Sequence, residues 1–260
     1  MGLRALLARL RQARHAGQRG VASSPDRDDA ATLALARKHE HYWYNAQKKV
    51  DLRRLDGFGE LAERIRAEGR TYLHLDRLYT LWQGVVGMPS SGQVVVEVGV
   101  FKGGSAKFIA EALRHIGRSL PVYACDTFTG HTIVDPARDG RHQVGRQFTG
   151  VEFAQVQDYL RDYPDVCLVA GDIHVTATRL DAVNAFGLVH IDVDVYPPTK
   201  FCLERFAPRV VVGGIVVVDD YGFKTCPGAR QAVDEFAAAH PQFRLLHLMT
   251  GQAVLTRVAS

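Results

Sequence analysis

The sequence predicts an α/β fold in which helices cover a mostly parallel sheet. From residue 93 onward, short runs rich in valine and isoleucine alternate with stretches that have helical periodicity. Buried parallel strands have this nearly continuous β-branched composition, and their alternation with helices is typical of a sheet wrapped on both faces. The composition agrees, because 47% hydrophobic and 23% charged residues are ordinary values for a globular protein.

Residues 1–90 are predicted to form a helical N-terminal region. Leucines at positions 3, 6, 7 and 10 recur at helical spacing between arginines, which predicts a short basic amphipathic helix over residues 3–14. Packing on another subunit, contact with a membrane surface and a targeting function remain alternative roles for this helix. A linker is expected over residues 17–29, and helical periodicity continues from there to about residue 88.

Residues 91–260 are predicted to form the α/β domain. Its strands are expected at residues 93–98, 122–125, 166–170, 188–192 and 215–219. Its helices are expected at residues 105–115, 199–206 and 228–239. Residues 243–248 and 253–257 are expected to close the chain as an antiparallel hairpin.

The segment 127–150 is predicted to be a lid over a binding site. It is long, contains glycines at positions 130, 140, 145 and 150, and follows a strand at the edge where such sheets bind ligands. Loops of this length in compact domains are usually functional or disordered. A lid would bring His131 and His142 toward a bound substrate.

The first strand ends in the stretch EVGVFKGGS, residues 97–105, which leads directly into a helix. A strand, glycine loop and helix in this order form the place where open α/β sheets bind a nucleoside-containing cofactor. The spacing G-x-x-x-G-G differs from the G-x-G-x-x-G of dinucleotide sites, so a ligand without phosphates is favoured. Gly99, Gly103 and Ser105 are the candidate contacts, and Glu97 would repel a pyrophosphate but attract a cationic amino-acid group.

Two further carboxylates are expected at the same sheet edge. Asp126 ends the second strand, where it can accept both ribose hydroxyls, and Asp172 follows the third strand near the expected adenine position. S-adenosylmethionine carries an ammonium group, a sulfonium and no phosphate, so it is the predicted cofactor. Another nucleotide remains the alternative.

Asp192, Asp219 and Asp220 are the predicted metal ligands. A strand order of 3-2-1-4-5 would place them side by side at the carboxyl ends of two neighbouring strands, beside the Gly99 loop. Unpaired carboxylates at that spacing repel one another unless a cation neutralises them, and an all-oxygen set favours Mg²⁺ before Ca²⁺ or Mn²⁺. Asp194 is expected in the following turn, next to this set. Turn and helix capping by some of these aspartates is the alternative interpretation.

Three stretches carry a family resemblance. They are VVVEVGVFKGGSA from residue 94, CDTFTGH from residue 125, and HIDVDVYPPTKFCLERFAPRVVVGGIVVVDDYGFKTCPGARQAVDEF from residue 190. Together they closely resemble the macrocin O-methyltransferase (TylF-like) family over about residues 93–257. The resemblance implies a Rossmann-like class I methyltransferase fold with a mostly parallel seven-stranded sheet. It further implies S-adenosylmethionine as donor, Mg²⁺ on Asp192, Asp219 and Asp220, a hydroxyl acceptor often on a sugar, and homo-oligomers.

The predicted function is therefore Mg²⁺-dependent O-methylation of a sugar hydroxyl in a natural product or glycan. A sugar hydroxyl needs a base near neutral pH, and Asp192 and His131 are the two candidates. Methylation of a phenolic or catechol-type hydroxyl is an alternative on the same fold. A non-catalytic subunit that only binds the donor is a third possibility, which the intact aspartate set argues against.

The charge distribution and the cysteine spacing limit the kinds of partner and cofactor that the sequence predicts. Residues 1–20 hold five arginines and no acid, so the rest of the chain has a net charge of −1 and no nucleic-acid footprint. The four cysteines, separated by 42, 35 and 24 residues, match neither a redox pair nor a paired zinc site. With no apolar run of about 20 residues and no secretory signal, the expectation is a cytoplasmic enzyme acting on a small molecule.

Overall fold

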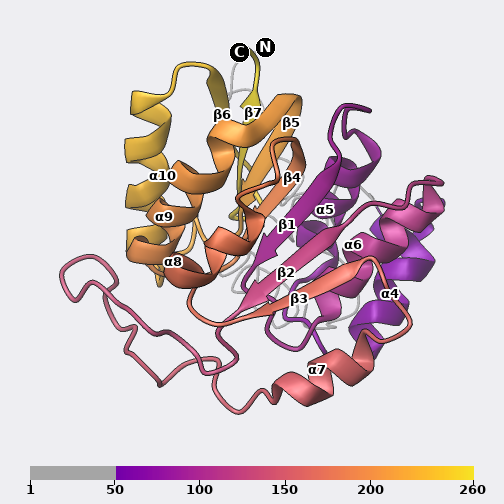
Figure 1. Ribbon diagram of the computed structural model, residues 1–260, viewed down its shortest axis with the longest axis horizontal. Helices are drawn as coiled ribbons and strands as arrows, with labels where there is room; N and C mark the ends of the chain where they lie inside the picture. The colour runs from indigo at the N-terminus through magenta and orange to yellow at the C-terminus, as the bar shows by residue number, and fades with distance from the viewer. Residues whose placement is uncertain (1–50) are drawn as a thin grey trace, which may run out of the picture. The chain divides into compact units, whose positions relative to one another are not determined.

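The chain folds around a seven-stranded sheet with helices on both faces (Figure 1). The structure is a computed structural model that describes residues 51–260. The sheet order is β3-β2-β1-β4-β5-β7-β6, which confirms the expected 3-2-1-4-5 arrangement and adds the closing hairpin at one edge. The amphipathic helix predicted over residues 3–14 and the linker over 17–29 lie outside the described residues.

The first five strands are parallel, and the last two are antiparallel. The strands are β1 (Val94–Val98), β2 (Val122–Asp126), β3 (Val166–Ala170), β4 (Phe186–Ile191), β5 (Val210–Val218), β6 (Phe243–His247) and β7 (Ala253–Arg257). Each predicted strand is present, with ends that differ by a few residues. The predicted α/β fold with a mostly parallel sheet is therefore confirmed.

The helices divide between the two faces of the sheet. The α-helices are α4 (Gly59–Ala67), α5 (Leu75–Val86), α6 (Gly104–His115), α7 (Phe153–Tyr159), α8 (Ile173–Thr176), α9 (Tyr196–Phe206) and α10 (Pro227–Ala239). Short 3₁₀ turns lie at η1 (Leu52–Arg54), η2 (Ala177–Leu180) and η3 (Ala207–Arg209). Figure 1 shows α8, α9 and α10 on one side of the sheet and α4, α5 and α6 on the other.

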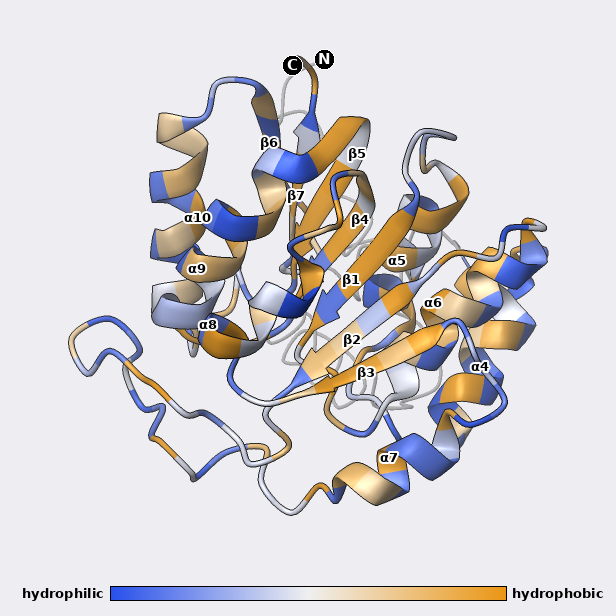
Figure 2. Ribbon diagram, viewed as in Figure 1, coloured by the Kyte–Doolittle hydropathy of each residue, from blue (hydrophilic) through white to orange (hydrophobic). Residues whose placement is uncertain are grey.

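The alternation of side chains along β1 explains why its sequence is apolar throughout. Val94, Val96 and Val98 belong to the hydrophobic cluster that includes α9 and α10. Val95 belongs to the cluster that includes α4, α5 and α6. Successive strand residues point to opposite faces, so a strand covered on both sides needs an apolar residue at every position. The central strands are accordingly among the most hydrophobic segments (Figure 2).

Strand β5 begins five residues earlier than its predicted start at 215. Its pairing with β4 shifts between Phe186, opposite Val210, and Leu188, opposite Ile215. Gly213 and Gly214 fill this irregular stretch, and a Cβ on Gly214 would lie 2.9 Å from the carbonyl oxygen of Gly187. Glycines thus permit a close approach of two backbones, while regular pairing resumes at the predicted residue.

The helices α4 and α5 come from the predicted N-terminal region and pack on the sheet. Leu61 and Ile65 of α4 and Leu78 of α5 share a cluster with Phe108 of α6. The start of α5, which includes Arg77, therefore lies beside the carboxyl ends of the parallel strands, where the candidate site is described below. The division of the chain at residue 90 stays a prediction. Among residues 51–260, no helix combines the length and the apolar character that crossing a bilayer requires.

Candidate functional site

A cavity lies at the carboxyl ends of β1, β2, β3 and β4, where the loop 127–150 also contributes to its wall. Most of the predicted site residues line it: Gly99, Ser105, Asp126, His131, Asp172, Asp192 and Asp220. Glu97, Gly103 and Asp219 are not among the lining residues. The structure thus brings together seven predicted residues from the ends of five strands, the start of α6 and the loop 127–150, and three predicted residues lie behind the cavity surface.

The glycine loop is shaped by two glycines with left-handed backbones. Gly99 has φ +97°, and a Cβ there would lie 1.8 Å from the carbonyl oxygen of Asp192. Gly103 has φ +89° and is the N-cap of α6, with Ser105 in the first turn. A residue without a side chain is required at Gly99 because β1 and the end of β4 approach each other there. The loop therefore keeps the cavity open beside Asp192.

Asp126 joins the glycine loop to the start of the loop 127–150. Its carboxylate accepts hydrogen bonds from the backbone N–H of Phe101 and that of Phe128, both at 2.7 Å. Burial raises the pKa of Asp126, while these amide donors oppose the rise. Each oxygen retains a lone pair, so the carboxylate can still receive hydroxyl groups from the cavity.

Asp172 caps the short helix α8. It accepts from the backbone N–H of His174 at 2.8 Å and from the hydroxyl of Thr132 at 2.6 Å. Burial opposes ionisation, but the hydrogen bonds from Thr132 and His174 hold the pKa of Asp172 below its usual value. Because Thr132 belongs to the loop 127–150, Asp172 also holds that loop at the end of β3.

Glu97 and His190 form a buried pair behind the cavity. Both side chains are fully buried on neighbouring strands, and Nδ1 of His190 lies 2.9 Å from Oε1 of Glu97. Nε2 of His190 lies 3.8 Å from Oδ1 of Asp219. Although burial opposes a charged imidazole, Asp219 and Glu97 raise the pKa of His190 to about 10. His190 is also absent from the residues that line the cavity, so it does not face an acceptor bound there.

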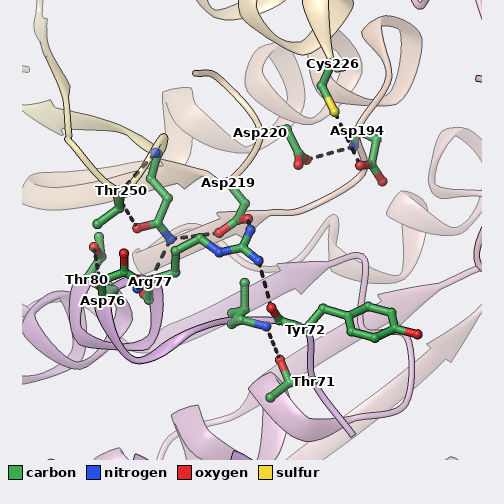
Figure 3. A network of polar contacts seen from close by, with 12 residues as sticks. Thr71, Tyr72, Asp76, Arg77, Thr80, Asp194, Asp219, Asp220, Cys226 and Thr250 are labelled. Atoms are coloured by element: carbon green, nitrogen blue, oxygen red, sulfur yellow. Dashed lines mark hydrogen bonds and ion pairs between the residues drawn. The ribbon is translucent and has the colours of Figure 1, made fainter. Parts of the chain in front are cut away.

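Arg77 of α5 reaches into the acidic set (Figure 3). Its guanidinium donates to the carboxylate of Asp219, and a second nitrogen donates to the carbonyl of Tyr72 at 3.0 Å. The other oxygen of Asp219 accepts from Nε2 of Gln252 at 2.8 Å. Burial opposes ionisation of Asp219, but Arg77 and His190 lower the pKa of its carboxyl.

Asp192 and Asp220 line the cavity and are less well compensated than Asp219, although His190 and Arg77 partly lower the pKa of Asp192. Within residues 51–260 neither forms an ion pair, and Asp220 accepts from the backbone N–H of Asp194 at 3.0 Å. Burial first, and then repulsion from neighbouring aspartates, raises the pKa of both carboxyls well above the usual value. A cation entering the cavity would relieve this repulsion. His190, Asp192 and Asp219 also place ligand atoms within 4.8 Å of one another.

A cluster of polar side chains fixes the loop 127–150 against the start of α10. Nδ1 of His142 lies 3.3 Å from Nε2 of His131, and Nε2 of His142 lies 3.0 Å from the carbonyl of Thr225. The thiol of Cys226 donates to Oδ1 of Asp194 at 3.5 Å and lies 3.7 Å from His142. The loop is thus tied to the turn after β4 and to α10, and its role as a moving lid stays a prediction.

His131 is the candidate base that faces the cavity. Burial, and to a smaller extent the neighbouring His142, lowers the pKa of His131 to about 4. Its imidazole is therefore neutral over most of the pH range and can accept a proton. A conjugate acid of low pKa makes it a weaker base than an ordinary histidine.

Arg77, Gln252 and Tyr72 are functional-site residues that the sequence analysis did not single out. Arg77 and Asp219 are 142 residues apart, and Gln252 precedes β7. Each lies in a segment whose local pattern indicates only a helix, a hairpin turn or a loop. Their placement follows from the packing of α5 and of the hairpin beside β5, which no motif in the chain records.

Comparison with known proteins gives one family and several relatives. The macrocin O-methyltransferase (TylF) family matches residues 30–255. Demethyldecarbamoylnovobiocin O-methyltransferase of Streptomyces niveus is 28% identical over 197 residues, which are 68% of this chain and 73% of that protein. The 8-demethyl-8-(2,3-dimethoxy-alpha-L-rhamnosyl)-tetracenomycin-C 4'-O-methyltransferase of Streptomyces olivaceus is 26% identical over 204 residues, 74% of this chain and 67% of that protein.

Among solved structures, the O-methyltransferase NovP superposes with a TM-score of 0.60 at 25% identity. The match covers 73% of this chain and 83% of NovP. The similarity in structure therefore extends over most of both chains.

Proposed function

The chain belongs to the macrocin O-methyltransferase (TylF) family, and from this premise we propose that it transfers a methyl group from S-adenosylmethionine to a sugar hydroxyl of a small glycosylated molecule. Two relatives named as O-methyltransferases of glycosylated Streptomyces products support this acceptor class. The observation that carries the proposal is a cavity in which a glycine loop meets Asp192 and Asp220, two carboxylates without an ion pair among residues 51–260.

We assign the donor to the side of the cavity formed by the ends of β1, β2 and β3. The Gly99 loop offers close backbone approach, and Asp126 offers a carboxylate to the ribose hydroxyls. Asp172 lies at the end of β3, where the adenine is expected. Glu97 is buried behind this wall and paired with His190, so we propose that it acts on the donor site indirectly, by holding His190 in place.

The carboxylates fit a hard divalent cation such as Mg²⁺. Asp192, which is half-buried, and Asp220, which is buried, present only oxygen ligands to the cavity, and both have raised pKa values that a cation would lower. Asp219 lies behind them and forms an ion pair with Arg77, which compensates its negative charge. When bound, the cation would lower the pKa of an acceptor hydroxyl.

The chain's own residues would orient the acceptor and receive its proton. Asp192 and His131 both line the cavity, and either can accept a proton from a hydroxyl held between them. The reaction then requires the acceptor oxygen, the methyl carbon and the sulfur in line, with oxygen and carbon roughly 3–3.5 Å apart. The rigid ends of β1 and β4, joined by the Gly99 contact, supply that alignment.

The decisive test measures methylation and donor binding separately. The enzyme is incubated with S-adenosylmethionine, Mg²⁺ and a panel of acceptors that includes demethyldecarbamoylnovobiocin, simple rhamnosides, phenols and catechols. Mass spectrometry records methylated product, and calorimetry records binding of S-adenosylhomocysteine. We expect methylation of at least one sugar, loss of turnover in Asp220→Asn, and donor affinity within a few fold of wild type in that variant. Methylation of phenols or catechols alone would refute the sugar acceptor.

We propose that the enzyme is cytoplasmic. The cysteines at 125, 167, 202 and 226 are all free thiols, which supports a cytoplasmic enzyme in a reducing compartment.

We also propose a homo-oligomer, in which the region 1–90 contributes to subunit contacts. Light scattering on the full chain, compared with a chain that begins at residue 51, measures the subunit number and the part that the first 50 residues take in it.

A further inference from the structure

An aromatic wall, defined as Tyr72, Phe101 and Phe148, lines one side of the cavity. The rings of Tyr72 and Phe101 are stacked, with centroids 5.1 Å apart and planes at 27°. Phe148 meets Phe101 edge-on, with centroids 5.9 Å apart and planes at 85°. The three rings come from the segment before α5, from the glycine loop and from the end of the loop 127–150. Phe101 thus contacts one ring by stacking and a second ring at nearly a right angle.

The wall is exposed although aromatic side chains usually gain by burial. Tyr72 is 66% exposed and Phe148 is 40% exposed. Phe101 and Phe148 also have left-handed backbones, with φ of 51° and 57°, a conformation that bulky residues rarely adopt. Strained residues of this kind persist where the surrounding structure imposes them, and they gather at ligand sites. A ligand that covered the rings would recover the apolar burial that the free protein lacks.

Two contacts connect the wall to the acceptor side of the cavity. Arg77 donates to the carbonyl of Tyr72 at 3.0 Å and also to the carboxylate of Asp219. Figure 3 shows the ring of Tyr72 directed away from that shared guanidinium. Phe148 packs edge-on against His131, with centroids 5.7 Å apart. Tyr72 and Phe148 are therefore held by residues next to the proposed reaction centre. Phe101 belongs to the glycine loop, and its backbone N–H donates to Asp126 on the donor side, so the wall borders both sides of the cavity.

We propose that the aromatic wall is a subsite for an aromatic aglycone, so that the preferred acceptors are aryl glycosides whose sugar reaches the carboxylates. This inference rests on the proposed sugar acceptor and adds the class of group attached to that sugar. Aromatic rings prefer offset stacking and edge-to-face contact, and rings that already contact one another in both ways can extend the same contacts to an aromatic group of the ligand. Tyr72 supplies the stacking face and Phe148 supplies the edge contact.

The test uses two glycosides that differ only in the aglycone. Dissociation constants of 4-nitrophenyl α-L-rhamnopyranoside and methyl α-L-rhamnopyranoside are measured by calorimetry on protein saturated with S-adenosylhomocysteine and Mg²⁺. We expect the wild-type enzyme to bind the aryl glycoside at least about fivefold more tightly, the range of an aromatic contact. Tyr72→Ala should reduce this ratio to near one with little change for the methyl glycoside. Tyr72→Phe should keep the ratio.

Met249→Ala is the matched control, because Met249 is 59% exposed and lies outside the cavity. An unchanged ratio in Tyr72→Ala, or a ratio near one in the wild type, would overturn the aromatic subsite. So would a loss of S-adenosylhomocysteine affinity in Tyr72→Ala without a change in the ratio, because the wall would then belong to the donor.

Turnover of the same glycosides separates this inference from the function on which it rests. Methylation of both glycosides, with equal affinities, would leave the sugar acceptor intact and reject the wall. Failure of the wild-type enzyme to bind either glycoside would contradict the rhamnoside acceptor and the subsite together.

Discussion

The guanidinium of Arg77, on α5, pairs with the carboxylate of Asp219, at the end of β5, across 142 residues of sequence. The side chain of Asp219 is fully buried, and that of Arg77 is 14% exposed. The pair joins a helix of the N-terminal region to the strand end that carries the acidic set. The same guanidinium donates to the backbone carbonyl of Tyr72, so Arg77 also helps to position Tyr72.

Removal of Arg77 should destabilise the fold strongly. Arg77→Gln leaves the buried charge of Asp219 without its main partner, so we expect a loss of about 3–5 kcal/mol in the free energy of unfolding. Arg64→Gln is the control, because Arg64 pairs with Glu111 at the surface with its side chain 53% exposed. That change should cost at most about 1 kcal/mol. Urea denaturation measures both, and equal losses would contradict a special role of the buried pair.

Gly99 should be intolerant of any side chain. In Gly99→Ala the new Cβ would meet the carbonyl oxygen of Asp192 at 1.8 Å, so the end of β4 must shift and donor binding should fall at least about tenfold. Gly117→Ala offers the comparison, because Gly117 also has positive φ, +70°, but open space around it. We expect that change to cost only about 1–2 kcal/mol of stability and no donor affinity. Calorimetry with S-adenosylhomocysteine would refute the assignment if both variants bind alike.

Acidification should weaken the fold through His131. Its pKa is lowered to about 4, whereas an unfolded histidine titrates near 6.5. Between these values the unfolded chain binds the proton more readily, so stability falls as the pH decreases from about 6.5 to about 4. His131→Gln removes this contribution and should show a smaller drop in melting temperature between pH 7 and pH 5. His247→Gln, at an exposed position of β6, should retain the wild-type drop.

The loop 127–150 should loosen when His142 is removed. His142→Ala deletes the contacts with Thr225, Cys226 and His131, so brief opening of the loop becomes more frequent. Trypsin should then cleave after the loop arginines at positions 138, 141 and 146 about tenfold faster, which corresponds to about 1.4 kcal/mol in the opening equilibrium. Cleavage after Arg161 is the internal control, and an equal rise there would indicate global destabilisation instead.

The order and type of the elements were readable from the sequence because they depend on local pattern. Continuous valine runs such as that of β1 require burial on both faces, and helical stretches between them require right-handed crossovers onto a parallel sheet. The carboxyl ends of such strands meet at one edge of the sheet, so the sequence predicts that Gly99, Asp126, Asp172 and Asp192 belong to one site. For these residues, the spacing of the motifs along the chain was sufficient to predict their place at the site.

Tertiary structure alone decided which charges neutralise one another and which side chains face the cavity. Glu97 and Asp219 stand at strand ends like the cavity residues, yet both are withdrawn to pair with His190 and Arg77. The aromatic wall likewise joins Tyr72 with Phe148 from segments that share no pattern. Local periodicity determines which face of an element is apolar, but partners between distant elements are set by how those faces pack, and that packing is encoded across the whole chain.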